Sequence, residues 1–399
     1  IGNKATVKAG TQSGLSQENP LYGKVSVIAG KSFTIGDEAQ ILSDDLLVSA
    51  EKDIRFGDKA TLVGATDGVT VRSSKGSIYM GEDLTVTSNA SKTLFEAGKN
   101  IVIDRDAKLD SQDNSVVFSA GEDIRFEEDF KVHGKGFELK AQGSLIVGDK
   151  ATVQTKFGKY ETGSIESLPQ TSIDVKGDVR FGNDATFRTT MLSMSAGDDE
   201  NHTSGNIAFG ERASIQTTVL GAVIDAEGDI AFGAGANIRT QEDQADSYVR
   251  ISSRGQTSFG ENAYVTSGTT LDIIGNKGIF LDKGAVLQSK LEDGSKNHTS
   301  LVSEHGDIRL GENSVVQGQT AYIRTGDESG VGGGSIELGD NSQVSARDNV
   351  SMNVTGDVVL DGQFLSTSLH ETEIRSSEGN VVLKDESELI SYGDVYLDA

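Results

Sequence analysis

The 399-residue chain has no cysteine, no tryptophan and only two prolines. The absence of cysteine excludes disulfide bonds and cysteine-based zinc or redox sites. No run of 18 consecutive apolar residues occurs, so no segment reads as a membrane-spanning helix. Basic residues are also scarce, because 36 Lys and Arg stand against 61 Asp and Glu and leave a net charge of −25. That balance disfavours nucleic-acid binding, which depends on Lys and Arg neutralising phosphates.

Recognisable motifs for catalysis or metal binding are missing as well. The sequence contains no GxSxG, P-loop, dinucleotide or HExxH motif. It also lacks an EF-hand loop and the calcium-binding nonapeptide GGxGxDxUx. We therefore expect no catalytic residue, no cofactor and no dedicated metal site. The five histidines are scattered without zinc-ligand spacing: His133, His202, His298, His305 and His370.

One phrase recurs from one end of the chain to the other. Residues 53–62 read DIRFGDKATL, and near-copies begin at Gly143, Gly177, Gly205 and Gly306. Aligned on the residue equivalent to Phe56, all sixteen copies have an apolar anchor, although only 35% of the chain is hydrophobic. The next residue is Gly in eleven copies, and recurrence at about 25 residues predicts a solenoid. The anchors are Ile1, Ile35, Phe56, Met80, Ile103, Phe126, Val147, Phe181, Phe209, Phe232, Phe259, Leu281, Leu310, Leu338, Leu360 and Leu383.

Each repeat contains three short segments in which apolar and polar residues alternate, as in strands with one buried face. A strand must meet its own copy one repeat later in the same direction, which requires the chain to coil. We therefore expect an all-β parallel β-helix solenoid of about 16 turns with three short strands per turn. The handedness rule for parallel crossovers favours a right-handed coil. Residues 1–399 would form one β-helix segment, with a structural core stack of Phe56, Phe126, Phe181, Phe209, Phe232 and Phe259.

Glycines and insertions mark the predicted corners. The 48 glycines are expected there because glycine adopts positive φ without steric cost. Pro20 and Pro169 lie in insertions at residues 8–24 and 154–172. The sequence begins and ends inside a repeat without a polar capping turn, which would expose strand edges. We expect a segment that is uncapped at both ends and belongs to a longer chain or a filament.

Acidic residues follow many of the anchors at the same corner. A functional interpretation is a ladder that binds Ca²⁺ or performs catalysis, and the alternative is a solvated polar corner. Like charges on neighbouring strands repel by only about 1 kcal/mol in water, so no metal is required. The acids are Asp37, Asp58, Glu82, Asp149, Glu211, Glu261, Glu312 and Asp340.

Two surface features suggest further roles. Threonines such as Thr61 and Thr85 recur in the second segment, but Lys108 and Lys131 interrupt the column, which argues against an ice-binding lattice. Asn-x-Ser/Thr triplets mark candidate glycosylation sites. They begin at Asn89, Asn201, Asn297, Asn349 and Asn353.

The phrases Gly-Asp-Ile-x-Phe/Leu-Gly and Val-x-Ala-Gly, as in residues 115–124, resemble the repeats of filamentous-haemagglutinin-type bacterial exoproteins. These are large β-helical adhesins of bacterial surfaces, and the resemblance covers nearly the whole chain. The N-terminal secretion domain of that family is not found in this sequence. The resemblance implies an extracellular or cell-surface fibre that contacts other cells or matrix.

The primary hypothesis is a non-enzymatic structural rod of an extracellular fibre or surface adhesin, which associates end to end or continues into further repeats. Its partners would be copies of itself, adjoining repeats, or host-cell, matrix or glycan surfaces, with no nucleic acid and no membrane insertion. Unbroken core columns favour this role. The alternative is a polysaccharide-active, pectate-lyase-like β-helix enzyme with sites near residues 154–172.

Overall fold

The repeats fold into parallel strands in the computed structural model. It divides into two compact units, Ile1–Ser193 and Met194–Ala399, and each is described by itself. The structure describes residues 1–9, 23–89, 91–156, 170–201, 203–240, 247–290, 297–327, 332–361, 363–365, 369–384 and 387–399.

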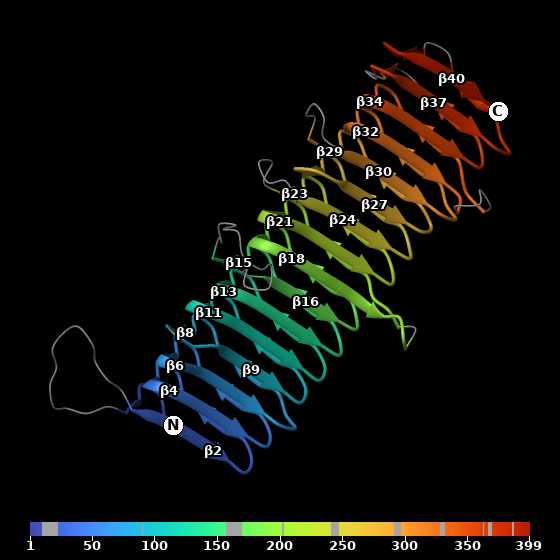
Figure 1. Ribbon diagram of the computed structural model, residues 1–399. Helices are drawn as coiled ribbons and strands as arrows, with labels where there is room; N and C mark the ends of the chain where they lie inside the picture. The colour runs from blue at the N-terminus through green and yellow to red at the C-terminus, as the bar shows by residue number, and fades with distance from the viewer. Residues whose placement is uncertain are drawn as a thin grey trace. The chain divides into compact units, whose positions relative to one another are not determined.

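In the first unit, the anchor phrases from Ile35 to Phe181 form three-residue strands that pair in parallel with their copies in neighbouring turns, whereas Ile1 lies outside the strands. Phe56, for example, lies opposite Ile35 in the preceding turn and Met80 in the following turn. Figure 1 shows β4, β6, β9, β11 and β13 as arrows that point in one direction. The short strands are β3 (Phe33–Ile35), β5 (Ile54–Phe56), β7 (Ile78–Met80), β10 (Ile101–Ile103), β12 (Ile124–Phe126), β14 (Leu145–Val147) and β17 (Val179–Phe181). The other strands are β1 (Thr6–Lys8), β2 (Lys24–Ala29), β4 (Gln40–Ala50), β6 (Thr61–Ser73), β8 (Thr85–Ser88), β9 (Thr93–Ala97), β11 (Lys108–Ala120), β13 (Lys131–Ala141), β15 (Thr152–Thr155), β16 (Thr171–Val175) and β18 (Thr186–Asp198).

The second unit repeats the arrangement. The last residues of β18, from Met194 on, belong to this unit, and β19 (Thr203–Ser204) pairs antiparallel with them, Gly197 lying opposite Ser204. The short strands are β20 (Ile207–Phe209), β22 (Ile230–Phe232), β25 (Thr257–Phe259), β28 (Ile279–Leu281), β31 (Ile308–Leu310), β33 (Ile336–Leu338), β35 (Val358–Leu360) and β38 (Val381–Leu383). The others are β21 (Ser214–Ala226), β23 (Asn237–Thr240), β24 (Tyr248–Ser253), β26 (Tyr264–Ser267), β27 (Leu271–Gly275), β29 (Val286–Ser289), β30 (His298–Ser303), β32 (Val315–Thr325), β34 (Gln343–Val354), β36 (Gln363–Leu365), β37 (Glu371–Ser376), β39 (Glu388–Ile390) and β40 (Asp394–Asp398).

The fold is therefore an all-β parallel solenoid of about 15 turns, and the described residues contain no helix. This confirms the predicted all-β parallel solenoid, and the right-handed coil stays a prediction. The three predicted segments are present, but the second and third often run as one strand, such as the 13-residue β6. In other turns they are separate strands, both where residues are inserted, as between β23 and β24, and where the spacing equals that of β6, as between β8 and β9. The strands form two large sheets, one of three-residue strands and one that contains the longer strands, and β36 pairs with β39 in a small third sheet.

The anchor phenylalanines are buried, with 1% to 5% of their surface exposed. Phe232 stacks between Phe209 and Phe259, with ring centroids 4.8 and 5.0 Å away and planes within 4° of parallel. In the first unit, Phe126 instead stacks on Phe130 of its own turn at 4.2 Å. Phe181 meets Phe187 edge to face at 4.8 Å. The aromatic core thus contains stacked rings both between turns and within a turn.

The predicted reason for the glycines after the anchors is wrong. The residue with positive φ is the third after the anchor, for example Lys59 at 57° and Asn262 at 56°. Gly57, next to its anchor, is required for a different reason. A Cβ atom there would lie 2.6 Å from the backbone nitrogen of Asp37 in the preceding turn. Close packing of consecutive turns, and not backbone conformation, therefore selects glycine at this position.

Candidate functional site

The acids that follow the anchors form a ladder of side-chain to backbone hydrogen bonds between turns. Oδ1 of Asp37 accepts a hydrogen bond from the backbone N–H of Asp58 at 3.1 Å. Oδ1 of Asp58 accepts one from Glu82 at 3.0 Å. Further along, Oδ1 of Asp149 accepts one from Asn183 at 2.7 Å. These carboxylates hold the backbone of the next turn in register, and a charged acceptor strengthens each bond.

We name this row of carboxylates the anchor ladder. Exposed ion pairs between turns surround it. The ammonium of Lys150 lies 2.6 Å from Glu128, and its hydrogen bond and charge hold the pKa of that carboxyl below its ordinary value. Lys283 lowers the pKa of Glu312 in the same way across 2.8 Å. Arg105 pairs with Glu82 at 3.0 Å. Because solvent screens these exposed pairs, each contributes little to the stability of the fold.

The eight acids predicted at this corner are therefore used in several ways. Four lie in the first unit and four in the second. Glu211 pairs with the adjacent Arg212 at 3.3 Å, whereas Glu261 and Asp340 contribute backbone carbonyls to bonds between turns. In the described part of the chain, no three His, Cys, Asp or Glu side chains gather as they would around a metal ion. The contacts favour the polar-corner interpretation over a Ca²⁺ ladder.

A second ladder runs along the corner before the short strands, and the sequence analysis did not identify it. In the first unit, Oδ1 of Asp53 accepts from Ser77 N–H at 3.1 Å, and Oγ of Ser77 accepts from Asn100 N–H at 3.3 Å. Asn100 then accepts from Asp123 at 2.9 Å, and Asp123 accepts from Ser144 at 2.7 Å. The available signal was the Asp, Asn or Ser that directly precedes most of the short strands. We name this row the pre-strand ladder.

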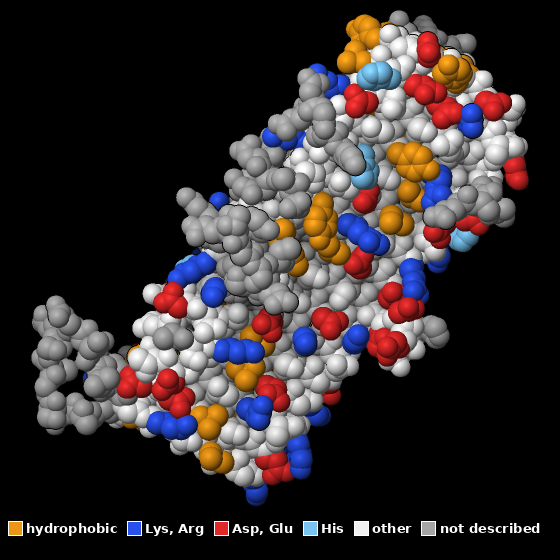
Figure 2. All heavy atoms as spheres, viewed as in Figure 1, with side chains coloured by type: hydrophobic (Ala, Val, Ile, Leu, Met, Phe, Trp, Pro, Cys, Tyr) orange, Lys and Arg blue, Asp and Glu red, His pale blue; other side chains and the backbone are white. Residues whose placement is uncertain are grey.

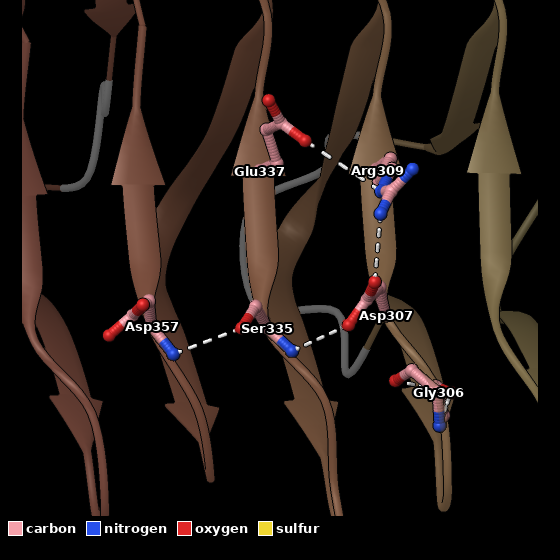
Figure 3. A network of polar contacts seen from close by, with 7 residues as sticks. Gly306, Asp307, Arg309, Ser335, Glu337 and Asp357 are labelled. Carbon is pink, nitrogen blue, oxygen red and sulfur yellow. Dashed lines mark hydrogen bonds and ion pairs between the residues drawn. The ribbon is translucent and has the colours of Figure 1, made fainter.

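The second unit contains the same device (Figure 3). Oδ1 of Asp307 accepts from the N–H of Ser335 at 3.0 Å, and Oγ of Ser335 accepts from the N–H of Asp357 at 3.1 Å. The other carboxylate oxygen of Asp307 accepts from Nη2 of Arg309 at 3.0 Å. A Cβ at Gly334 would lie 2.5 Å from Oδ1 of Asp307, so glycine leaves room for the ladder.

Three of the histidines approach acids of a neighbouring turn. Nδ1 of His133 lies 3.2 Å from Asp110, and Nε2 of His298 lies 3.1 Å from Asp272. His370 is 3.9 Å from Asp348. His305 instead lies 3.4 Å from the carbonyl oxygen of Gly332. His202 lies outside the described residues.

The candidate glycosylation sites differ in access. The side chains of Asn89, Asn201 and Asn349 are exposed, and that of Asn353 is half-buried. Asn297 is only 7% exposed, and its Nδ2 donates to the carbonyl of Lys290 at 3.2 Å. In the folded chain, Asn297 is therefore closed to a glycosylating enzyme.

The strand register aligns threonines of successive turns in one column, but other residue types occupy the same column. In the first unit the register places Thr61 opposite Gln40 and Thr85, and Lys108 opposite Thr85 and Lys131. The long side chains interrupt the flat surface that ice binding requires. Figure 2 shows a face on which acidic and basic side chains are interspersed, without a large patch of one sign.

The predicted insertions fall largely outside the described residues. This applies to Pro20, Pro169 and most of residues 8–24 and 154–172, which include the sites proposed for an enzyme. The described residues contain no helix with the length and hydrophobicity needed to cross a membrane. Comparison with known proteins found no match among family models, curated proteins or solved structures.

Proposed function

We propose that the chain is a non-enzymatic structural element of an extracellular fibre or surface adhesin of filamentous-haemagglutinin type. The observation that carries this proposal is the pair of ladders that join consecutive turns at both corners. In the anchor ladder and the pre-strand ladder, polar side chains that could bind a ligand instead accept backbone hydrogen bonds. Such a surface is built for cohesion between turns.

Cohesion along the solenoid comes from three sources. The backbone bonds between parallel strands run through both units. The buried anchors add apolar contact, and the ladders fix the corners. A unit with these features resists local unfolding, as part of a fibre exposed to mechanical load requires. Its net charge of −25 would limit lateral clumping of exposed strands.

The proposed partners are copies of the chain or adjoining repeats, and host-cell, matrix or glycan surfaces. We propose an extracellular or cell-surface location for this acidic chain. The resemblance of the Gly-Asp-Ile-x-Phe/Leu-Gly phrases to adhesin repeats supports the same location.

Electron microscopy of the native protein on and around its cells tests the proposal. An extended fibre labelled by antibodies against this chain is the expected result. Discrete intracellular particles would contradict the proposal. Turnover of an acidic polysaccharide, measured with and without Ca²⁺ and abolished by changing one carboxylate, would instead establish the enzyme alternative.

A further inference from the structure

A groove on the outer face of the second unit carries an inference beyond a structural role. It has a volume of about 370 Å³, within the size range of sites for small molecules. Its lining includes Tyr322, Arg324, Asn353, Arg375 and Asp398. Strands β32, β34, β37 and β40 contribute these residues, so four consecutive turns build the groove.

The strand register explains why two arginines meet there although they lie far apart in sequence. Arg324 is opposite Asn353, Asn353 is opposite Arg375, and Arg375 is opposite Asp398. With neighbouring strands roughly 4.8 Å apart, the Cα atoms of Arg324 and Arg375 lie about 10 Å from each other. In a chain of net charge −25, the column brings two guanidinium groups into one groove.

Arg324 differs from the paired arginines on the surface. Nε of Arg375 bonds Glu373 at 2.7 Å, and Arg309 bonds Asp307 at 3.0 Å. The Nε of Arg324 is buried but has no hydrogen-bond partner, and its guanidinium forms no ion pair with the described residues. A buried donor without an acceptor costs free energy, and guanidinium groups match carboxylates as paired donors. The groove therefore offers a charged donor set to a bound anion.

The other residues that line the groove narrow the class of anion that it could bind. Asp327 and Asp398 balance the two arginines, so the groove has no excess positive charge for a polyphosphate. A ligand with one carboxylate and several hydroxyl groups fits better, because Asp and Asn side chains can bond the hydroxyls. The ring of Tyr322 offers an apolar face against which a sugar ring can lie. These are the features of a uronic-acid unit.

We propose that this groove binds a uronic-acid unit of an acidic glycan, with Arg324 holding its carboxylate. The proposal does not depend on the fibre role, since a solenoid can serve as a fibre with or without a glycan site. Asn353 lines the groove and is also a candidate glycosylation site, so a glycan attached there would occupy the same space.

Isothermal titration calorimetry of the full chain with trigalacturonate tests the proposal. The methyl ester of the same trisaccharide keeps the hydroxyls and removes the charge. We expect the acid to bind and the ester to bind at least tenfold more weakly. R324Q should weaken binding of the acid at least tenfold. R324K, which keeps the charge and loses the planar fork, should weaken it at least threefold.

The matched control is R309Q, which removes an exposed, ion-paired arginine of the same unit. It should leave affinity within twofold of the parent. Far-UV circular dichroism should show R324Q melting as the parent does, because Arg324 has no bond to lose. Equal binding of acid and ester, full affinity in R324Q, or an equal loss in R309Q would overturn the proposal. So would absence of binding by the parent to both trigalacturonate and a glucuronate oligosaccharide.

Discussion

Oδ1 of Asp123 lies 2.7 Å from the backbone nitrogen of Ser144 in the following turn, while the N–H of Asp123 donates to Asn100 in the preceding turn at 2.9 Å. One residue therefore joins three turns of the pre-strand ladder. Asp123→Ala removes the acceptor and leaves the Ser144 N–H without its partner. We expect the free energy of unfolding to fall by about 1–2 kcal/mol, measured by urea denaturation.

Asp123→Asn separates the contribution of the hydrogen bond to the free energy of unfolding from the contribution of the charge. It keeps an acceptor oxygen at the same place and should recover more than half of the loss. Glu138→Ala is the matched control, because the side chain of this exposed acid on β13 forms no hydrogen bond or ion pair with the described residues. If Glu138→Ala lowered the free energy of unfolding as much as Asp123→Ala does, the change in net charge and not the loss of the ladder bond would explain the destabilisation.

Gly57→Ala tests the close approach of turns at the anchor corner. The added Cβ would lie 2.6 Å from backbone atoms of Asp37 and Gly36, neither of which can rotate away. We expect a loss of about 2–3 kcal/mol, as for other overpacked sites, seen as a lower midpoint in thermal denaturation. Gly30→Ala is the control, since nothing lies within 4 Å of its added Cβ. An unchanged midpoint in Gly57→Ala would show that the turns can separate there at little cost.

Lys59 tests the backbone conformation two residues further on. Its φ of 57° is in the left-handed region, which disfavours β-branched residues most strongly. Lys59→Val should destabilise the fold by about 1–2 kcal/mol. Lys59→Gly should stay within about 0.5 kcal/mol of the parent, because relief of strain offsets the flexibility gained by the unfolded chain. Urea denaturation of both variants is the measurement, and equal effects would contradict the argument.

The sequence predicted the parallel coil because the anchors, such as Phe56 and Phe209, repeat with little variation. It misassigned the role of Gly57, since a need for space and a need for positive φ both select glycine. The pre-strand ladder was missed because Asp, Asn and Ser at one position look like ordinary solvent-facing residues. The groove residues Arg324 and Arg375 come together only through the register of β32, β34 and β37, which no local pattern encodes.

Phe232 tests the aromatic core of the second unit. Its ring stacks at 4.8 Å on Phe209 and at 5.0 Å on Phe259, and its side chain is 4% exposed. Phe232→Ala should lower the free energy of unfolding by about 3–5 kcal/mol through lost burial and a cavity between the two rings. Phe232→Leu should cost less than half as much, because Leu281 and Leu310 occupy equivalent anchor positions. Calorimetry measures both, and a loss below about 1 kcal/mol for the Ala variant would mean that the neighbouring rings close the gap.

Asp225 on β21 links stability to pH in a direction opposite to that of Glu128, whose pKa is lowered by Lys150. Burial raises the pKa of its carboxyl above the ordinary value, and the charge of Arg250 opposes this only in part. Above the raised pKa the carboxylate is ionised in both the folded and the unfolded chain, so the burial penalty is fully present. As pH falls through the raised pKa, the folded chain takes up the proton first and the penalty disappears by the ordinary pKa. Asp225→Asn should therefore raise the melting temperature at pH 7 and have no effect near pH 3.

Glu138→Gln is the control for the Asp225 experiment, because it removes the same charge from an exposed position. Its melting temperature should change less than that of Asp225→Asn at pH 7. Thermal denaturation between pH 3 and pH 7 gives the difference between the two variants at each pH. A difference that stays constant over this range would show that packing of the amide, and not ionisation of Asp225, is responsible.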